Sequence, residues 1–201
     1  MTALLLAALL AAPAAAQERP VSGSVSGTLA GHWDLQDYQG RVWLSVSSFG
    51  GSLGFSGRPL SGSLFSDGAG RWTVSAAGVS GSISRFGNAV DVSASVTGPQ
   101  GSRWVSFTMY VNGTGDAASP PSLSVFSGDA SLDFGPTYRG YSMSGTVDDK
   151  RFGDEGVALA MRAAATVLKD LPAAKAAPLP KAGWLEKSAA VAPFLKAGFG
   201  R

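Results

Sequence analysis

The chain has 201 residues, of which 45% are hydrophobic, with 16 Lys and Arg against 14 Asp and Glu, no cysteine and a single histidine, His32. Without cysteine the chain has no disulfide, no thiol nucleophile and no thiolate metal site. Because it has a single histidine, a metal site with several histidine ligands is excluded. Charge is uneven, since residues 17–172 carry a net −2 and residues 173–201 a net +4. Because residues 17–172 are slightly acidic, we expect no nucleic-acid partner.

The first 16 residues predict a secretory signal peptide. Residues 3–12 are all Ala or Leu, and Ala14, Ala15 and Ala16 form a small-residue cleavage site. This apolar run is too short to span a bilayer. We therefore expect an exported protein that begins near Gln17 and works in the periplasm, outside the cell or at its surface.

Residues 17–149 alternate between apolar and small polar side chains, which predicts an antiparallel β domain. In the stretch RWVSFTMYV, Val105, Phe107, Met109 and Val111 face one way, and NAVDVSASV repeats the pattern over residues 88–96. This period of two is typical of half-buried strands, and turn sequences such as SDGAG and TGPQG separate the runs. The sequence predicts a mainly β fold of nine or ten strands in a meander that closes into a small barrel, with a sandwich as second choice.

Three hairpins share a Gly, Arg and Trp signature at the start of the returning strand. Tryptophans at strand starts can form a platform on which a glycan or another small ligand stacks, with arginines supplying hydrogen bonds. The alternative is that these rings close the barrel end or lie in the core. The candidate ligand-binding residues are Trp43, Trp72, Trp104, Arg41, Arg71 and Arg103.

Residues 150–172 predict one amphipathic α-helix packed on or beside the β domain. Val157, Met161, Ala164, Leu168 and Leu171 are spaced as one stripe of a helix. Acidic residues open the segment, Lys169 lies near its end, and Pro172 stops it. Asp148, Asp149, Asp154 and Glu155 are expected to cap the helix and to solvate this connection.

Residues 173–201 predict an extended Ala- and Pro-rich linker followed by a basic, aromatic tail. Its apolar anchors suit either a partner protein or an anionic envelope surface. Folding back on the β domain is the alternative. The candidate partner-binding residues are Trp184, Leu185, Lys187, Val191, Phe194, Leu195 and Phe199.

The stretch AGHWDL around Gly31 and Trp33 resembles the Gly-x-Trp opening of lipocalin and avidin-like barrels, and PTYRGY over residues 136–141 is similar to a second lipocalin motif but lacks its aspartate. A meander followed by one helix also fits that plan. The resemblance covers a few residues, and no family is assigned on it.

The sequence predicts a non-enzymatic accessory or binding protein of the cell envelope that acts through its C-terminal tail, without cofactor or metal. No calcium loop or phosphate-binding glycine loop is present. Two alternatives remain open. One is a β-barrel that carries a small ligand or binds a glycan, and the other is a hydrolase with paired carboxylates from separate strands.

Overall fold

The computed structural model describes residues 17–27, 31–49, 52–98 and 101–172, which form twelve strands and one helix. The predicted signal peptide and the tail of residues 173–201 lie outside the described residues. The strands are β1 (Glu18–Gly27), β2 (His32–Asp37), β3 (Trp43–Phe49), β4 (Ser52–Arg58), β5 (Gly62–Ser66), β6 (Arg71–Ala76), β7 (Val79–Phe86), β8 (Ala89–Gly98), β9 (Gly101–Asn112), β10 (Ser122–Ser127), β11 (Ala130–Thr137) and β12 (Gly140–Asp148), and the helix is α2 (Gly153–Asp170).

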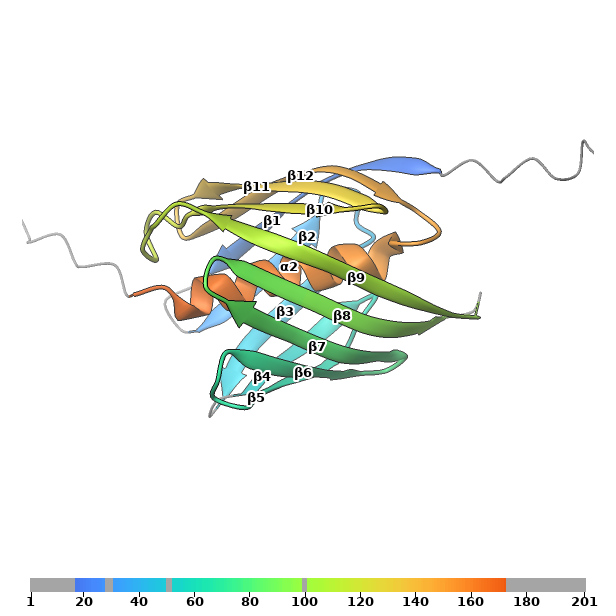
Figure 1. Ribbon diagram of the computed structural model, residues 1–201, viewed down its shortest axis with the longest axis horizontal. Coiled ribbons are helices and arrows are strands. Elements are labelled where there is room, and N and C mark those ends of the chain that lie inside the picture. Colours follow the sequence, from blue (N-terminus) through green and yellow to red (C-terminus); the bar gives the residue numbers. More distant parts are fainter. Residues whose placement is uncertain (1–16, 28–30, 50–51, 99–100, 173–201) are drawn as a thin grey trace, which may run out of the picture.

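The strands form a closed antiparallel barrel, which confirms the predicted meander and barrel (Figure 1). Each strand pairs with its neighbours in sequence, and β1 closes the ring on β12 over the register Glu18↔Asp148 to Ser26↔Gly140. Closure gives each strand two neighbours, so the sheet has no edge strand open for pairing with another chain. The sequence underestimated the number of strands because several hairpin turns are only two residues long.

The alternation predicted from the sequence points the apolar side chains into the barrel. In β9 and β8 the expected residues, including Val105, Phe107, Met109, Val92 and Val96, are buried, and the residues between them face outward. The buried core continues through all twelve strands of the described chain. The inward face is therefore mainly apolar, and the outward face carries mainly small polar side chains with several exposed aromatic rings.

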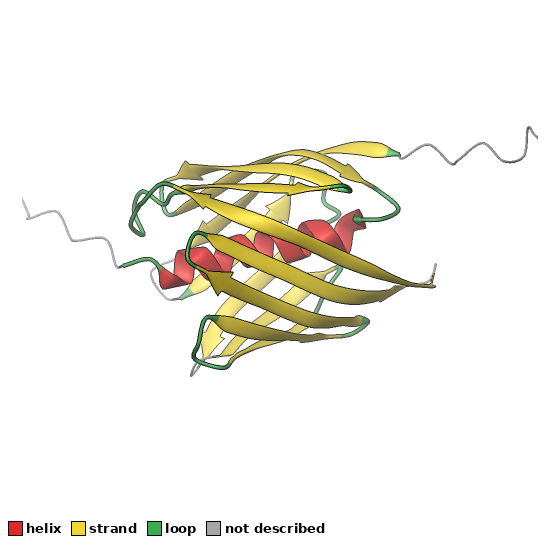
Figure 2. Ribbon diagram, in the orientation of Figure 1, coloured by secondary structure: helices red, strands yellow, loops and turns green. Residues whose placement is uncertain are grey.

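Helix α2 lies inside the barrel, so the expectation that it packs on or beside the β domain is wrong (Figure 2). Fourteen of its eighteen residues are buried, and it contacts β1, β2 and β12 on one wall and β8 and β9 on another. A helix that is apolar all round belongs in a core rather than on a surface. Beyond the predicted stripe, α2 also buries Ala158, Ala165 and other small residues that fit within the lumen. No described helix is long and apolar enough to cross a membrane.

Glycine makes room for the helix at one point of the wall. Gly23 on β1 faces inward, and a Cβ built there would meet Met161 Cε at 2.7 Å and the backbone oxygen of Gln36 at 2.4 Å. Any larger residue would push either the helix or β2 aside. Gly23 therefore sets how closely α2 approaches β1.

The barrel has two distinct ends because every strand reverses direction. Helix α2 enters from the end where β12 finishes, here called the entry end, and leaves at the end where β12 begins, here called the exit end (Figure 1). Gln17 lies at the entry end, whereas Leu171 and Pro172 lie at the exit end. The two ends of the described chain thus lie at opposite ends of the barrel.

Removing the helix tests whether the barrel can stand without it. A chain that ends at Phe152 should aggregate or lose cooperative unfolding, because the apolar lining of the lumen would be exposed to water. A chain that ends at Pro172 keeps α2 and is the matched control. Solubility, circular dichroism and thermal melts of both check the expectation, and a soluble, cooperatively unfolding 17–152 chain would contradict it.

Candidate functional site

The three tryptophans of the predicted platform do not meet on one surface. Trp43 and Trp104 point outward and are 50% and 63% exposed, but β3 and β9 are six strands apart in either direction around the ring. Trp72 on β6 points inward and is buried. The alternative interpretation, a core tryptophan, thus describes Trp72, while Trp43 and Trp104 lie on opposite walls of the barrel.

The three arginines of the predicted site also separate. Arg41 and Arg103 lie at the entry end, where Arg41 is 3.7 Å from Asp149 and Arg103 forms an ion pair with Glu155. Arg71 faces solvent on β6, opposite Ser84 of β7. Two of the three arginines therefore contact the segment that leads into α2 rather than an open surface.

The entry end holds a cluster of ion pairs between the barrel and the start of the helix. Arg19 donates to Asp149 at 2.7 Å and to Asp154 at 2.5 Å, and Arg103 donates to Glu155 and to the backbone oxygen of Phe152. Burial raises the pKa of Asp154, an effect that Arg19 reduces but does not cancel. Three of the four predicted acidic residues, Asp149, Asp154 and Glu155, therefore bind barrel arginines. The N-cap position, Phe152, makes no side-chain cap.

An ion pair and a backbone hydrogen bond hold the helix at the exit end. Arg85 at the end of β7 is 3.4 Å from Asp170, the last residue of α2. The loop between β9 and β10 adds a backbone hydrogen bond from Ala117 to the oxygen of Pro172, at 3.2 Å. Ion pairs of this partial exposure add little stability each, but together they fix the position of α2 along the barrel axis.

Arg162, in the middle of α2, is the one charged side chain at the centre of the lumen in the part of the chain that the structure describes. It is 1% exposed, its guanidinium carbon lies 4.8 Å from the centre of the Phe55 ring, and none of its side-chain nitrogens has a hydrogen-bond partner among the described residues. Burial lowers the pKa of its guanidinium to about 9, so it remains charged at neutral pH. A buried charge with only a ring contact destabilises the inserted helix.

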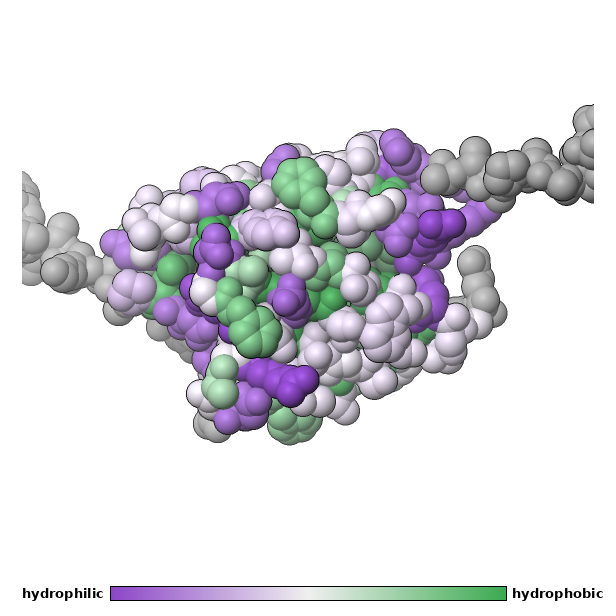
Figure 3. Space-filling model, viewed as in Figure 1, coloured by the Kyte–Doolittle hydropathy of each residue, from purple (hydrophilic) through white to green (hydrophobic). Residues whose placement is uncertain are grey.

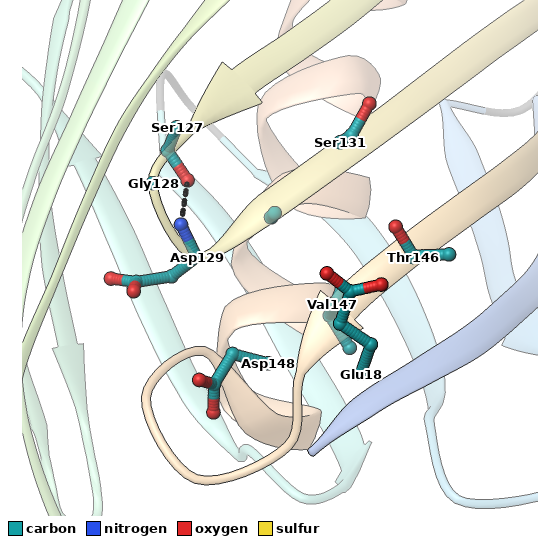
Figure 4. A pocket seen from close by; sticks show the side chains of 9 residues that line it. Glu18, Ser127, Gly128, Asp129, Ser131, Thr146, Val147 and Asp148 are labelled. Carbon is teal, nitrogen blue, oxygen red and sulfur yellow. Dashed lines mark hydrogen bonds between the residues drawn. The ribbon is translucent and has the colours of Figure 1, made fainter. Parts of the chain in front are cut away.

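An open pocket of about 130 Å³ lies on the outside at the entry end, lined by β10, β11, β12 and the start of β1 (Figure 4). Its carboxylates, Glu18, Asp129 and Asp148, point in different directions. Backbone N–H groups of Arg151 and Lys150 donate to Asp148 and lower the pKa of its carboxyl, and Asp129 is 3.5 Å from Arg151. These contacts are those of a turn that leads into α2, and they leave no pair of carboxylates facing across a cleft. Within the described ranges, no three His, Cys, Asp or Glu side chains are grouped to hold a metal ion.

The outward face of β6–β9 carries a grid of hydroxyl side chains that the sequence reading did not single out. Cross-strand pairing aligns them in three rows. The first row is Ser75, Ser80 and Ser95, the second is Thr73, Ser82, Ser93 and Ser106, and the third is Ser84, Asp91 and Thr108. We call these rows the hydroxyl face. Figure 3 shows this side of the barrel as a pale surface of near-neutral hydropathy with isolated green patches and a few purple groups.

Exposed aromatic rings border the hydroxyl face. Trp104 ends the first row, Phe65 of β5 begins the second and Phe126 of β10 ends the third. Phe86 and Tyr110 lie in the adjoining row toward the exit end, and all five rings are between 43% and 68% exposed. The sequence did contain a signal for these rings. Each aromatic occupies one of the alternating strand positions that face solvent.

Comparisons with protein-family models, with curated proteins and with solved structures found no match to the chain. The site is therefore interpreted from its own geometry.

Substitution of the tryptophans should separate the buried ring from the exposed ones. Trp72→Ala should lower the free energy of unfolding by about 3–5 kcal/mol, because it empties a core position. Trp43→Ala and Trp104→Ala should each change it by less than about 0.5 kcal/mol, as is usual for surface positions. Denaturant titrations of the three variants measure this, and a large loss in Trp104→Ala would contradict its exposed position.

Replacing the buried arginine should stabilise the protein. Arg162→Met keeps the length of the side chain and removes a desolvated charge, so the free energy of unfolding should rise by about 1–4 kcal/mol. Met161→Ala, one residue earlier on the same helix, is the matched control and should lower it by about 2–5 kcal/mol. Thermal and urea unfolding report both values. A loss of stability in Arg162→Met would mean that the guanidinium has a partner in solution.

Proposed function

We propose that this chain is an exported, non-enzymatic binding protein of the cell envelope, periplasmic or at the cell surface. It acts through its outer surface and through residues 173–201, which engage an anionic envelope surface or a partner protein. The lumen of the barrel serves structure alone.

The occupied lumen is the observation that carries this proposal. A barrel that carries a small ligand needs interior space at its centre. Here α2 runs through that space, and Arg19, Arg103 and Arg85 hold it at both ends. Opening the lumen would require all of these ion pairs to break and an apolar helix to enter water. Binding at the outer surface requires neither change.

The position of the helix supports a role for the C-terminal segment. Because α2 ends at Asp170, the described chain leaves the barrel at the exit end, away from Gln17, and residues 173–201 follow in the sequence. The segment combines a net charge of +4 with apolar side chains that include Trp184 and Phe194. Basic charge with apolar anchors is the combination that favours an anionic membrane surface.

The hydrolase alternative has weaker support. The three carboxylates of the outer pocket do not face one another, and two of them are engaged in the turn before α2. A glycoside hydrolase needs two carboxyl groups on either side of one bond.

Vesicle binding tests the proposal directly. The full mature chain should bind vesicles containing phosphatidylglycerol at low salt and should lose most of that binding at high salt, because the attraction is electrostatic. It should bind phosphatidylcholine vesicles weakly. A chain ending at Pro172 keeps the barrel and the helix, and it should not bind either kind of vesicle. Sedimentation with vesicles measures all four combinations.

Two variants, one that changes a charge and one that removes an aromatic ring, distinguish an anionic lipid surface from a protein partner. Lys187→Glu should weaken vesicle binding more than Trp184→Ala at low salt if the surface is anionic lipid, whereas a protein groove would depend more on Trp184. Equal vesicle binding by the full chain and by the chain ending at Pro172 would overturn the role assigned to residues 173–201.

A further inference from the structure

We propose that the hydroxyl face and its bordering aromatic rings bind an extended, neutral polysaccharide of β-linked hexose units. This site lies on the wall of the barrel, and it is separate from residues 173–201.

The chemistry of the face selects the class of ligand. Serine and threonine hydroxyls both donate and accept hydrogen bonds, and they match a ligand whose own groups are hydroxyls. Exposed aromatic rings at the ends of the rows offer flat apolar surfaces against which the C–H face of a sugar ring can stack. The two features together fit a carbohydrate better than either a purely apolar or a purely ionic ligand.

The scarcity of charge argues for a neutral ligand. Among the described residues of the three rows, the charged groups are Asp91 and, opposite Ser84, Arg71. The Asp91 carboxylate accepts a hydrogen bond from the Thr108 hydroxyl at 2.8 Å, which occupies one of its oxygens within the face. Nucleic acid and anionic lipid both require several basic groups, and Arg71 is the one basic residue in these rows among the described residues. Protein partners are disfavoured as well, because serine is depleted at protein interfaces.

The geometry of the rows suits an extended chain. Neighbouring strands in a sheet lie about 4.8 Å apart, close to the length of one hexose unit in an extended β-linked polymer. A polymer lying across the strands along the second row, from Phe65 to Ser106, would pass one hydroxyl-bearing strand per sugar. Each of the three rows also meets one aromatic ring at an end, so stacking positions border the path on both sides.

Closure of the barrel gives this face its rigidity. The inward residues of the same strands, among them Val74, Ile83 and Val92, pack in the core and are at most 2% exposed. The outward hydroxyls are consequently held at the spacing of the sheet before any ligand arrives, and little ordering is needed on binding. A preformed face of this kind suits a polymer or the surface of an insoluble polysaccharide.

The test is the binding of the full mature chain to insoluble chitin and cellulose, together with titrations of chitohexaose and cellohexaose. We expect binding to at least one of these neutral polymers, with little change between low and high salt. Trp104→Ala and Phe126→Ala should each weaken it by about tenfold, since each removes one stacking ring. Trp43→Ala, on the opposite wall, is the matched control and should bind like the unmodified chain.

A charged substitution and the tail deletion complete the design. Ser93→Glu places a carboxylate in the middle of the second row and should weaken binding at least as much as the loss of a ring, with an unchanged melting temperature as the check of folding. The chain ending at Pro172 should keep polysaccharide binding, so that failure of the membrane proposal and failure of this one are distinguishable. Three outcomes would overturn the proposal. The first is that none of the four carbohydrates binds. The second is that Trp43→Ala and Trp104→Ala weaken binding equally, and the third is that anionic alginate binds more strongly than the neutral polymers.

Discussion

A twelve-stranded barrel must be filled, and the rest of this structure depends on that constraint. Eight strands enclose a space that their own side chains can occupy, but the diameter grows with the number of strands. The inward residues here are mostly of medium size, such as Val, Leu and Ala, and they leave room along the axis. Helix α2 occupies this room, so the helix and the barrel each bury the surface that the other exposes. Neither is a separate unit.

The composition of α2 follows from its position. Inside the lumen a helix meets wall on every side, and alanines at 158, 160, 163, 164 and 165 keep it narrow enough to fit. Charged groups of the helix lie near its two ends, where arginines of the barrel bind Asp154, Glu155 and Asp170. Arg162 is the exception. Its buried charge opposes insertion, so the inserted state depends on apolar packing and on the ion pairs at the ends to offset it.

The sequence predicted the barrel well because its period of two is regular and nearly every inward position is apolar. It predicted a helix within residues 150–172, where α2 spans Gly153–Asp170, but not that this helix lies inside the barrel. The stripe of Val157, Met161 and Leu168 was interpreted as one face of a surface helix, but between Gly156 and Leu168 the only polar side chains are those of Arg162 and Thr166, fewer than a surface helix requires. Arg41 and Arg103 were assigned to a ligand because their partners are distant in the sequence. Asp149 lies more than one hundred residues after Arg41, and Glu155 lies more than fifty residues after Arg103. Sequence spacing does not show such pairs.

The candidate binding surface was harder to predict for a related reason. Alternation specifies which residues point outward, but only cross-strand register shows which of them are neighbours, and register depends on bulges and turn lengths that no local pattern fixes. Trp104 and Phe126 are brought together with the serine rows by that register, while Trp43 is carried to the opposite wall. Their shared Gly, Arg and Trp signature describes how each hairpin begins and carries no information about a common site.

Folding requires only that the outward positions be compatible with water, and charged residues would meet that need at least as well as serine. The described outer wall of β6–β9 instead carries small hydroxyl groups, few charges and exposed rings at the borders. Single exposed aromatics are ordinary, but five of them around one grid with few charges are not explained by packing, since their side chains are largely outside the core. The inward half of each strand is accounted for by the helix that it encloses. The outward half is therefore where the function of this protein should be sought.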